Sequence, residues 1–265
     1  MKKYKIYDAH CHIYPDKIAE KAAASTGVFY GISMGYDGKV STLIERAREA
    51  DVSKCLVHSV ATKPEQVSSI NRFIADEVSK SAGMFIGFGA LHPESLDLDG
   101  DIEEIIGLGL RGVKLHPEIQ RFCIDDPKVL KIFDRIRGKL PLLVHAGDKR
   151  YDMSNPERIK RILELYPDMT VIGAHFAGYS VWNDVLGVLA GYDNLYVDCS
   201  SSFEFLTDEE IKRLIYGYGA DKVLFGSDYP MWNTARELDR LFSLGLSEDE
   251  YDMILGKNLE RLLGI

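Results

Sequence analysis

The stretch YKIYDAHCH, residues Tyr4–His12, predicts a short strand that ends in a pair of histidines. Side chains alternate between the two faces of a strand, so Asp8, His10 and His12 are expected on one face and the residues between them on the other. Two imidazoles that converge from one face form a chelating pair for a metal ion. Two unrelated histidines near a surface would have the same spacing, so the rest of the chain has to decide between these interpretations.

Strand-like and helix-like segments alternate along the rest of the chain. After a long connection at residues 13–38, in which 15–24 predict a short helix and the remainder a pocket cover, apolar strands are expected at 54–60, 84–91, 111–116, 140–146, 170–175, 195–199 and 222–227. Amphipathic helices separate them, and parallel strands joined in this way form either an open sheet or a closed barrel. With 265 residues, the eight units favour a single (β/α)8 TIM barrel, an α/β fold that spans residues 1–265 as one domain.

Charge and composition narrow the class of partner. The net charge of −9 and the isoelectric point near 5.3 disfavour binding to nucleic acid, because an acidic surface repels phosphates. The four cysteines are scattered and form no zinc-binding pair, so we expect them to pack as small buried side chains. The N-terminus has no apolar signal region, and no run is long enough for a membrane span. We therefore expect a cytoplasmic protein, without membrane contact, that acts on a small molecule.

The histidines lie where the predicted strands end. In a parallel barrel, all these carboxyl ends meet at one face, which is where such enzymes build their active sites. Neutral imidazole is the commonest metal ligand, and a cluster of this kind favours zinc, iron, manganese or nickel over magnesium. The histidines that follow strands are His10, His58, His92, His116, His145 and His175, with His12 two residues beyond the first.

A carboxylate follows the last predicted strand. In VLFGSDYP, residues 223–230, Asp228 comes directly after the apolar run. Taken alone, such a residue could cap a helix. Beside a histidine cluster, it is expected to be a metal ligand or a base toward water that the metal activates.

Several segments resemble those of a known family. Asp8–His12 is similar to the first-strand signature of the amidohydrolase superfamily of metal-dependent barrels. Further segments resemble the branch called amidohydrolase family 2, in the expected order along the chain: GVKLHP at 112–117, LPLLVHAG at 140–147, GAH at 173–175, FGSDYP at 225–230 and NLERLLG at 258–264.

The resemblance implies a metal site and a division of roles. It implies one divalent ion, with Zn²⁺ expected, held by His10, His12, His145 and Asp228. His175 is implied to lie close by and to orient or polarise the substrate. Asp228 is then the catalytic base, which accepts a proton from water and returns it to the leaving group. Asp8 is expected just outside the ligands, as a partner of a ligand histidine.

Two residues of the fourth predicted strand allow two interpretations. Lys114 lies two before His116, so both side chains share a face. In other branches of the superfamily a lysine on this strand is carboxylated and bridges a second metal, which requires a neutral amine. Alternatively, Lys114 is a cation that binds an acidic substrate or is buried in an ion pair. His116 is then a residue of the pocket or supports a ligand.

Aromatic residues in the expected loops at the same face are candidates for stacking on a cyclic substrate. These substrate-binding candidates are Tyr30, Tyr229 and Trp232. Ordinary packing within a loop is the alternative for each of them.

The expected activity is hydrolysis of a C–O or C–N bond in a lactone-like or amide-like small molecule through water activated by the metal. The first alternative is a metal-dependent decarboxylase, a lyase, of an aromatic or muconate-type acid. A metal-dependent deoxyribonuclease is a further alternative, which the acidic charge disfavours. The exposed helices could also support a homodimer.

Overall fold

The computed structural model describes residues 4–265, and the chain forms two compact units. Unit 1 comprises the chain up to His58, Glu77–Ile86 and Cys199–Ile265. Unit 2 comprises Ser59–Asp76 and Gly87–Asp198. Strands and helices alternate along both, as the sequence predicts for an α/β fold. The expectation of one domain stays a prediction.

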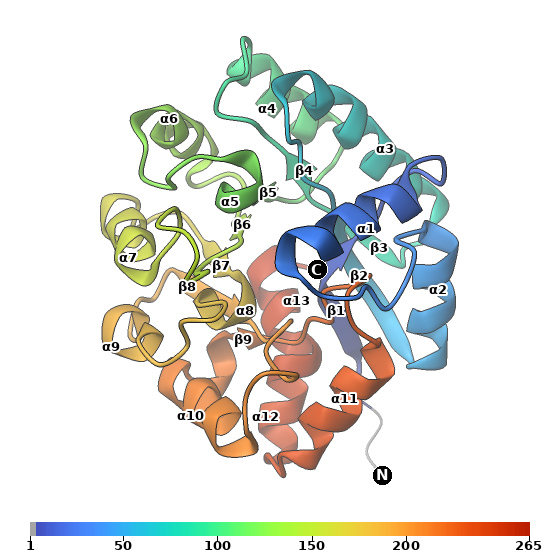
Figure 1. Cartoon of the computed structure of the whole chain (residues 1–265), viewed down its shortest axis with the longest axis vertical. Coiled ribbons are helices and arrows are strands. Elements are labelled where there is room, and N and C mark those ends of the chain that lie inside the picture. Colours follow the sequence, from blue (N-terminus) through green and yellow to red (C-terminus); the bar gives the residue numbers. More distant parts are fainter. Residues whose placement is uncertain (1–3) are drawn as a thin grey trace. The chain divides into compact units, whose positions relative to one another are not determined.

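Unit 1 is built around a long N-terminal strand. Its strands are β1 (Ile6–His12), β2 (Val52–His58), most of β3 (Phe85–Gly87) and β9 (Val223–Leu224). Its helices are α1 (Ala19–Tyr30), α2 (Val40–Glu49), α10 (Asp208–Tyr218), α11 (Thr234–Ser243), α12 (Glu248–Asp252) and α13 (Asn258–Leu263). A 3-10 turn, η2 (Ala220–Lys222), and a π-helical turn, η3 (Met253–Lys257), complete it. Figure 1 shows α2 beside β2 and next to α11.

Hydrogen bonds on both edges fix β1 in place. On one edge β1 pairs with β2 in parallel, so that His12 lies opposite His58. On the other edge the Ala9 amide donates to the Phe225 carbonyl over 2.8 Å, and the His12 amide donates to the Tyr229 carbonyl over 2.7 Å. The segment after β9 is therefore held against the histidine end of β1.

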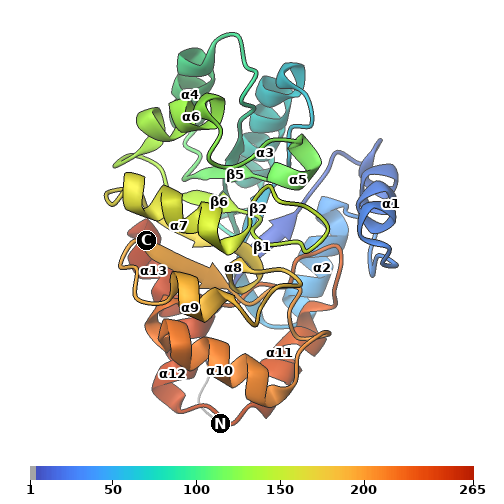
Figure 2. The same ribbon diagram turned by 60° about the vertical axis from the view of Figure 1, so that its left-hand side comes forward.

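Unit 2 contains five parallel strands in the order β4-β5-β6-β7-β8. They are β4 (Gly89–Ala90), β5 (Val113–Leu115), β6 (Leu142–Val144), β7 (Val171–Gly173) and β8 (Leu195–Asp198). The turn η1 (Pro64–Gln66) leads into α3 (Val67–Lys80), which begins in this unit. The other helices are α4 (Leu98–Gly107), α5 (Pro117–Gln120), α6 (Pro127–Ile136), α7 (Pro156–Leu165), α8 (Ala174–Ala177) and α9 (Val185–Leu189). Figure 2 shows α4 and α6 packed together in this unit.

Local sequence explains where these elements begin. The strand β6 reads Leu-Leu-Val and is fully buried, as expected for a parallel strand with both faces covered. Asn155 caps α7 by accepting from the Arg158 amide, and Pro156 occupies the first helical position. At α10, Thr207 and Glu210 form a capping box, in which each side chain accepts from the other residue's backbone amide.

Three helix boundaries differ from the sequence prediction. The helix expected at 15–24 is α1, which begins at Ala19 and runs into the glycine-rich stretch until Gly31, where φ is +69°. The pattern of 180–190 predicts one helix, but the structure has α9 there, which begins only at Val185 after a turn at 182–184; Ser180 itself is left-handed, with a φ of +63°. The pattern of 247–263 predicts a continuous terminal helix, which the π-helical turn η3 interrupts. The spacing of apolar residues along the sequence does not show where a helix is interrupted locally.

The connection after β1 carries a cavity of its own. It has a volume of about 790 Å³ and is lined by α1 and the segment 31–37, with Glu20 and Asp37 among its polar residues. Within residues 4–265, no helix is both long and apolar enough to cross a membrane.

Candidate metal centre

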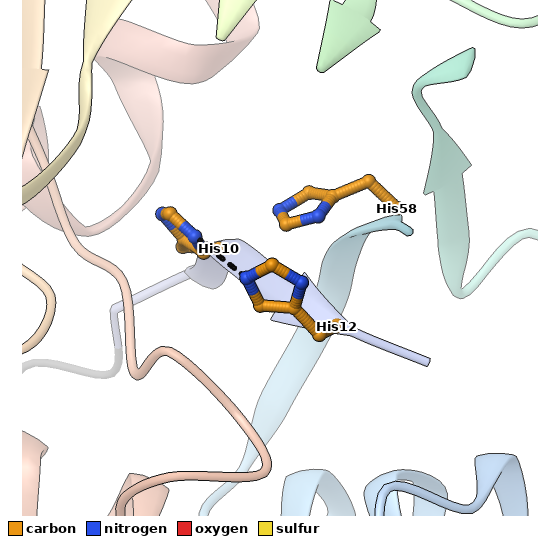
Figure 3. Close-up of side chains that lie close together, drawn as sticks. All are labelled: His10, His12 and His58. Carbon is orange, nitrogen blue, oxygen red and sulfur yellow. Dashed lines mark hydrogen bonds between the residues drawn. The ribbon is translucent and has the colours of Figure 1, made fainter. Parts of the chain in front are cut away.

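The histidine pair of β1 converges as the strand alternation predicts. His10 Nε2 lies 3.3 Å from His12 Nε2, as the dashed line in Figure 3 marks. His10 is fully buried, whereas the His12 side chain retains some exposure. Cys11, between them, is buried on the opposite face of the strand. The two imidazoles thus share one face at the carboxyl end of β1.

Asp228 joins this pair within unit 1. Its Oδ1 lies 3.4 Å from His10 Nε2 and 3.4 Å from His12 Nε2. The hydrogen bonds of β1 to Phe225 and Tyr229 hold this part of the chain against the histidines. Asp228 has a φ of +58°, a conformation that costs energy in any residue other than glycine.

The spacing of these three donor atoms fits a divalent metal ion. Ligand atoms about 2.0–2.1 Å from a tetrahedral ion lie about 3.3 Å from one another. The observed separations among His10, His12 and Asp228 are 3.3, 3.4 and 3.4 Å. Two imidazoles and one carboxylate also form the donor set that zinc and similar ions prefer. The residues therefore fit the metal that the sequence implies.

His58 lies beside the same pair, although it is not among the four metal ligands that the resemblance implies. Figure 3 shows the His58 ring beside those of His10 and His12. It packs edge-on against both, with ring centroids 4.8 Å from that of His10 and 4.4 Å from that of His12. Its donor atoms can approach those of His10 and His12 closely enough for the three to hold one ion. The register that sets His58 opposite His12 on β2 is a property of strand pairing. His58 is thus an additional candidate ligand.

Two serines after β8 contact the predicted ligands, and sequence analysis did not identify them. Ser200 Oγ lies 3.3 Å from His10 Nδ1, and Ser201 donates to Asp228 Oδ2 over 2.5 Å. Contacts of this kind orient metal ligands and select which ring nitrogen or carboxylate oxygen faces the ion. The run Cys-Ser-Ser-Ser at the end of a strand was the only available signal.

Asp8 supports the strand backbone instead of an imidazole ring. Its Oδ1 accepts from the backbone amides of His10 (3.2 Å) and Ser227 (2.9 Å). Burial raises the pKa of the Asp8 carboxyl to about 6, although the hydrogen bonds from Ser227 and His10 oppose this rise. Asp8 therefore ties β1 to the segment that carries Asp228.

Unit 2 brings together the other predicted histidines. His145 follows β6, His175 follows β7, and His145 Nδ1 lies 3.1 Å from His175 Nε2. The ring of His116 stacks on that of His145, with centroids 4.1 Å apart and an interplanar angle of 6°. All three side chains are buried. Three of the four predicted ligands, His10, His12 and Asp228, therefore lie together in unit 1. That His145 binds the same ion stays a prediction.

The backbone at His175 is unusual. His175, Phe176 and Ala177 have φ values of +59°, +54° and +55°, so three residues in succession are left-handed. The Asp198 carboxylate accepts from the His175 amide over 3.1 Å, and the Trp182 indole donates to the His175 carbonyl over 2.9 Å. These two contacts stabilise a strained conformation that presents the imidazole at the end of β7.

Lys114 and His116 lie on β5 and directly after it, and both are buried. A further acidic residue, Glu118, lies next to them and was not predicted. Its Oε2 is 3.4 Å from His116 Nδ1 and 3.9 Å from His145 Nε2, and its other oxygen accepts from Ser154. Burial raises the pKa of Glu118 to about 7. The assignment of Lys114 and His116 to a pocket or a second ion stays a prediction.

The predicted aromatic residues occupy different environments. Tyr229 is fully buried, and its hydroxyl donates to the Lys39 carbonyl over 2.7 Å. The Trp232 indole donates to Ser201 Oγ over 2.7 Å, so Trp232 contacts the serine that donates to Asp228. Tyr30 ends α1 and packs edge-on against Phe29. Their role in substrate binding stays a prediction.

Residues 7–265 match the model of a protein family described as Amidohydrolase. Because the match spans nearly the whole chain, this protein belongs to amidohydrolase family 2, as its motifs indicated. A search of curated proteins found no match.

Solved structures with the same fold include both hydrolytic and decarboxylating enzymes. An uncharacterized TIM-barrel protein from Bordetella bronchiseptica is 20% identical over 98% of each chain, with a TM-score of 0.79. A dihydroxybenzoic acid decarboxylase from Polaromonas sp., solved with manganese and 2-nitroresorcinol, is 15% identical over 99% of this chain and 97% of that one (TM-score 0.73). A probable 2-pyrone-4,6-dicarboxylic acid hydrolase from Acinetobacter baumannii, solved with citric acid, is 15% identical over 98% and 100% (TM-score 0.69). The TIM-barrel fold is therefore confirmed.

Proposed function

We propose that this protein is a metal-dependent hydrolase that cleaves a C–O or C–N bond of a small molecule such as a lactone or an amide. A single Zn²⁺ is held by His10, His12 and Asp228 together with His145. The observation that carries the proposal is the mutual separation of 3.3–3.4 Å among the donor atoms of the first three residues. A bound ion of this kind lowers the pKa of water and polarises a carbonyl oxygen.

The side chains of the chain itself supply proton transfer and orientation. Asp228 has one oxygen directed toward the two histidines and the other held by Ser201. The carboxylate accepts a proton from the attacking water and returns it to the leaving group. His175, whose backbone is fixed by Asp198 and Trp182, hydrogen-bonds the substrate oxygen.

An ion pair in unit 2 makes one arginine a weaker candidate for binding a substrate carboxylate. Arg150, in the loop after β6, pairs with the buried carboxylate of Asp148 through contacts of 2.7–3.2 Å. Because this guanidinium is already neutralised, it is poorly suited to a substrate carboxylate. Decarboxylation of an aromatic acid is the second candidate, favoured by the likeness to the Polaromonas decarboxylase.

The reaction class is tested with zinc-loaded protein and a panel of lactones, anilides and hydroxylated aromatic acids. Hydrolysis releases one carboxylic acid per turnover, which pH-stat titration records, and no carbon dioxide. Release of carbon dioxide from an aromatic acid, with no cleavage of lactones or anilides, would assign the decarboxylase activity instead.

Variants separate metal binding from turnover. His145→Ala is expected to lower the zinc content measured by elemental analysis, because a ligand is lost.

His175→Ala is expected to retain zinc and to lose turnover at least a hundredfold. His92→Asn serves as the control, because the His92 imidazole accepts a hydrogen bond from the Glu94 amide, over 3.2 Å, and so supports a turn. Full turnover in His175→Ala contradicts the role of His175.

A further inference from the structure

We propose that Ser201, itself held by Trp232, is a positioning residue that favours one oxygen of Asp228 for binding the metal. The inference rests on the proposed function, since it concerns one ligand of that site. It assigns a role to Ser201, which no motif identified, and a different role to Trp232, which the sequence indicated only as a candidate for stacking on a substrate.

The hydroxyl of Ser201 has one proton, and the contacts around it decide where that proton goes. Ser201 Oγ lies 2.5 Å from Asp228 Oδ2 and 3.5 Å from the Met231 sulfur. The carboxylate is the stronger acceptor, because its charge shortens and strengthens the bond. The Trp232 indole donates to the same Oγ over 2.7 Å. Since an indole N–H can only donate, Trp232 occupies a lone pair of Ser201 and directs its proton to Asp228.

This hydrogen bond gives the two carboxylate oxygens of Asp228 different partners. One oxygen, Oδ2, accepts from Ser201, while Oδ1 faces the Nε2 atoms of His10 and His12 at 3.4 Å each. The hydrogen bond competes for one lone pair of Oδ2, so Oδ1 is the oxygen favoured to bind the ion, and the second lone pair of Oδ2 stays available to accept a proton. The hydrogen bond also restricts the side chain, so less rotational freedom is lost when the ion binds.

The backbone of Ser201 shows why a serine at this position requires explanation. Its φ is +49°, and the residue is almost completely buried. This conformation is disfavoured in residues other than glycine, because the Cβ atom approaches the following carbonyl oxygen. A glycine would adopt this φ without strain. We therefore attribute the serine at this position to its hydroxyl, which glycine lacks.

Two variants separate the hydroxyl from the backbone strain. Ser201→Ala removes the hydroxyl and keeps the strain, whereas Ser201→Gly removes both. Hydrogen bonds to a charged group are stronger than those between neutral groups. We therefore expect both variants to bind zinc at least tenfold more weakly in competition with a chromophoric chelator. The glycine variant tests whether weaker binding follows from a distorted fold, since its backbone is relaxed and its circular dichroism is expected to be unchanged.

Two further measurements report on the mechanism of the effect. Trp232→Phe keeps the ring and removes the donor, so zinc affinity is expected to fall by a smaller factor, about two- to fivefold. In cobalt-substituted protein, Ser201→Ala frees the second carboxylate oxygen. The visible absorption is therefore expected to weaken as the number of ligands rises. Ser53→Ala is the control, because Ser53 only donates to the Ile6 carbonyl over 3.0 Å at the opposite end of β1.

The outcomes distinguish this inference from the proposed function. If wild-type protein binds zinc, His10→Ala does not, and both Ser201 variants bind as tightly as wild type, the metal site stands and the role of Ser201 is wrong. If wild-type protein itself binds no zinc, cobalt or manganese, both the proposed function and this inference are overturned.

Discussion

At the scale of single residues, Glu237 is a buried carboxyl whose pKa differs between the folded and the unfolded protein. It lies on α11, is 2% exposed, and among residues 4–265 its Oε2 has no hydrogen-bond partner. Burial raises its pKa to about 8, and the negative charges of Glu204, Asp8 and Asp228 act in the same direction, against a smaller opposing effect of Arg236. The protonated form is therefore favoured in the folded protein.

The raised pKa of Glu237 predicts how stability changes with pH in the metal-free protein. An unfolded glutamate loses its proton near pH 4.5, whereas the folded one keeps it until about pH 8. Between these values the native state binds more protons, so the free energy of unfolding falls as pH rises. Glu237→Gln should flatten this decline in urea unfolding at pH 5, 6.5 and 8, and the variant should be more stable than wild type at pH 8.

The control for Glu237 is the exposed residue Glu103, because Glu103→Gln removes a carboxylate without changing a buried one. It should leave the slope of stability against pH unchanged. An identical slope in Glu237→Gln and wild type would show that Glu237 is ionised throughout this range.

At the scale of elements, the turn from β7 into α8 determines where His175 lies. A Cβ atom on Gly173 would lie 2.5 Å from the Ala177 Cβ, well inside van der Waals contact. The left-handed residues from His175 to Ala177 fold this short helix back against the end of its strand. Glycine at 173 is thus required by close approach, since its own φ of −81° is allowed for any residue.

Gly173→Ala should therefore displace the His175 imidazole and also lower the stability of the fold. Overpacking of a buried position costs about 1–3 kcal/mol, so we expect a lower melting temperature and lower turnover with retained zinc in unit 1. Gly187→Ala on α9 is the matched control, because an added Cβ there meets no atom within 4 Å and alanine favours helix. Equal melting temperatures and turnover for Gly173→Ala and wild type would contradict the close approach.

At the scale of the whole molecule, metal binding and folding stability are coupled. An ion that binds the native state but not the unfolded chain stabilises the protein by about 2.7 kcal/mol at a free concentration one hundred times its dissociation constant. Zinc should therefore raise the melting temperature of chelator-treated protein. His10→Ala should abolish this increase, whereas His92→Asn should retain it. A melting temperature that does not depend on zinc in the wild-type protein would contradict a native metal site.

Much of the fold and part of the site followed from local sequence. Alternation along β1 places His10 and His12 on one face, because a strand repeats every two residues whatever surrounds it. The order of apolar strands and capped helices predicted an α/β barrel, and Asp228 was identified because it directly follows a buried run. These properties depend on neighbours along the chain, which a sequence displays.

The remaining features of the site depend on contacts between distant segments. His58 joins the histidine pair through the register of β2 on β1, and Ser201 reaches Asp228 across 27 positions of sequence. Asp198 holds the backbone of His175 from 23 residues away. A local pattern places His58 at the end of a strand but does not show that it joins the pair, and none marks Ser201 or Asp198. Strand register and left-handed backbone conformations arise only when packed strands and loops fix them. The sequence by itself determined the class of fold and the chemistry of the ligands, while tertiary packing decided which side chains hold those ligands in place.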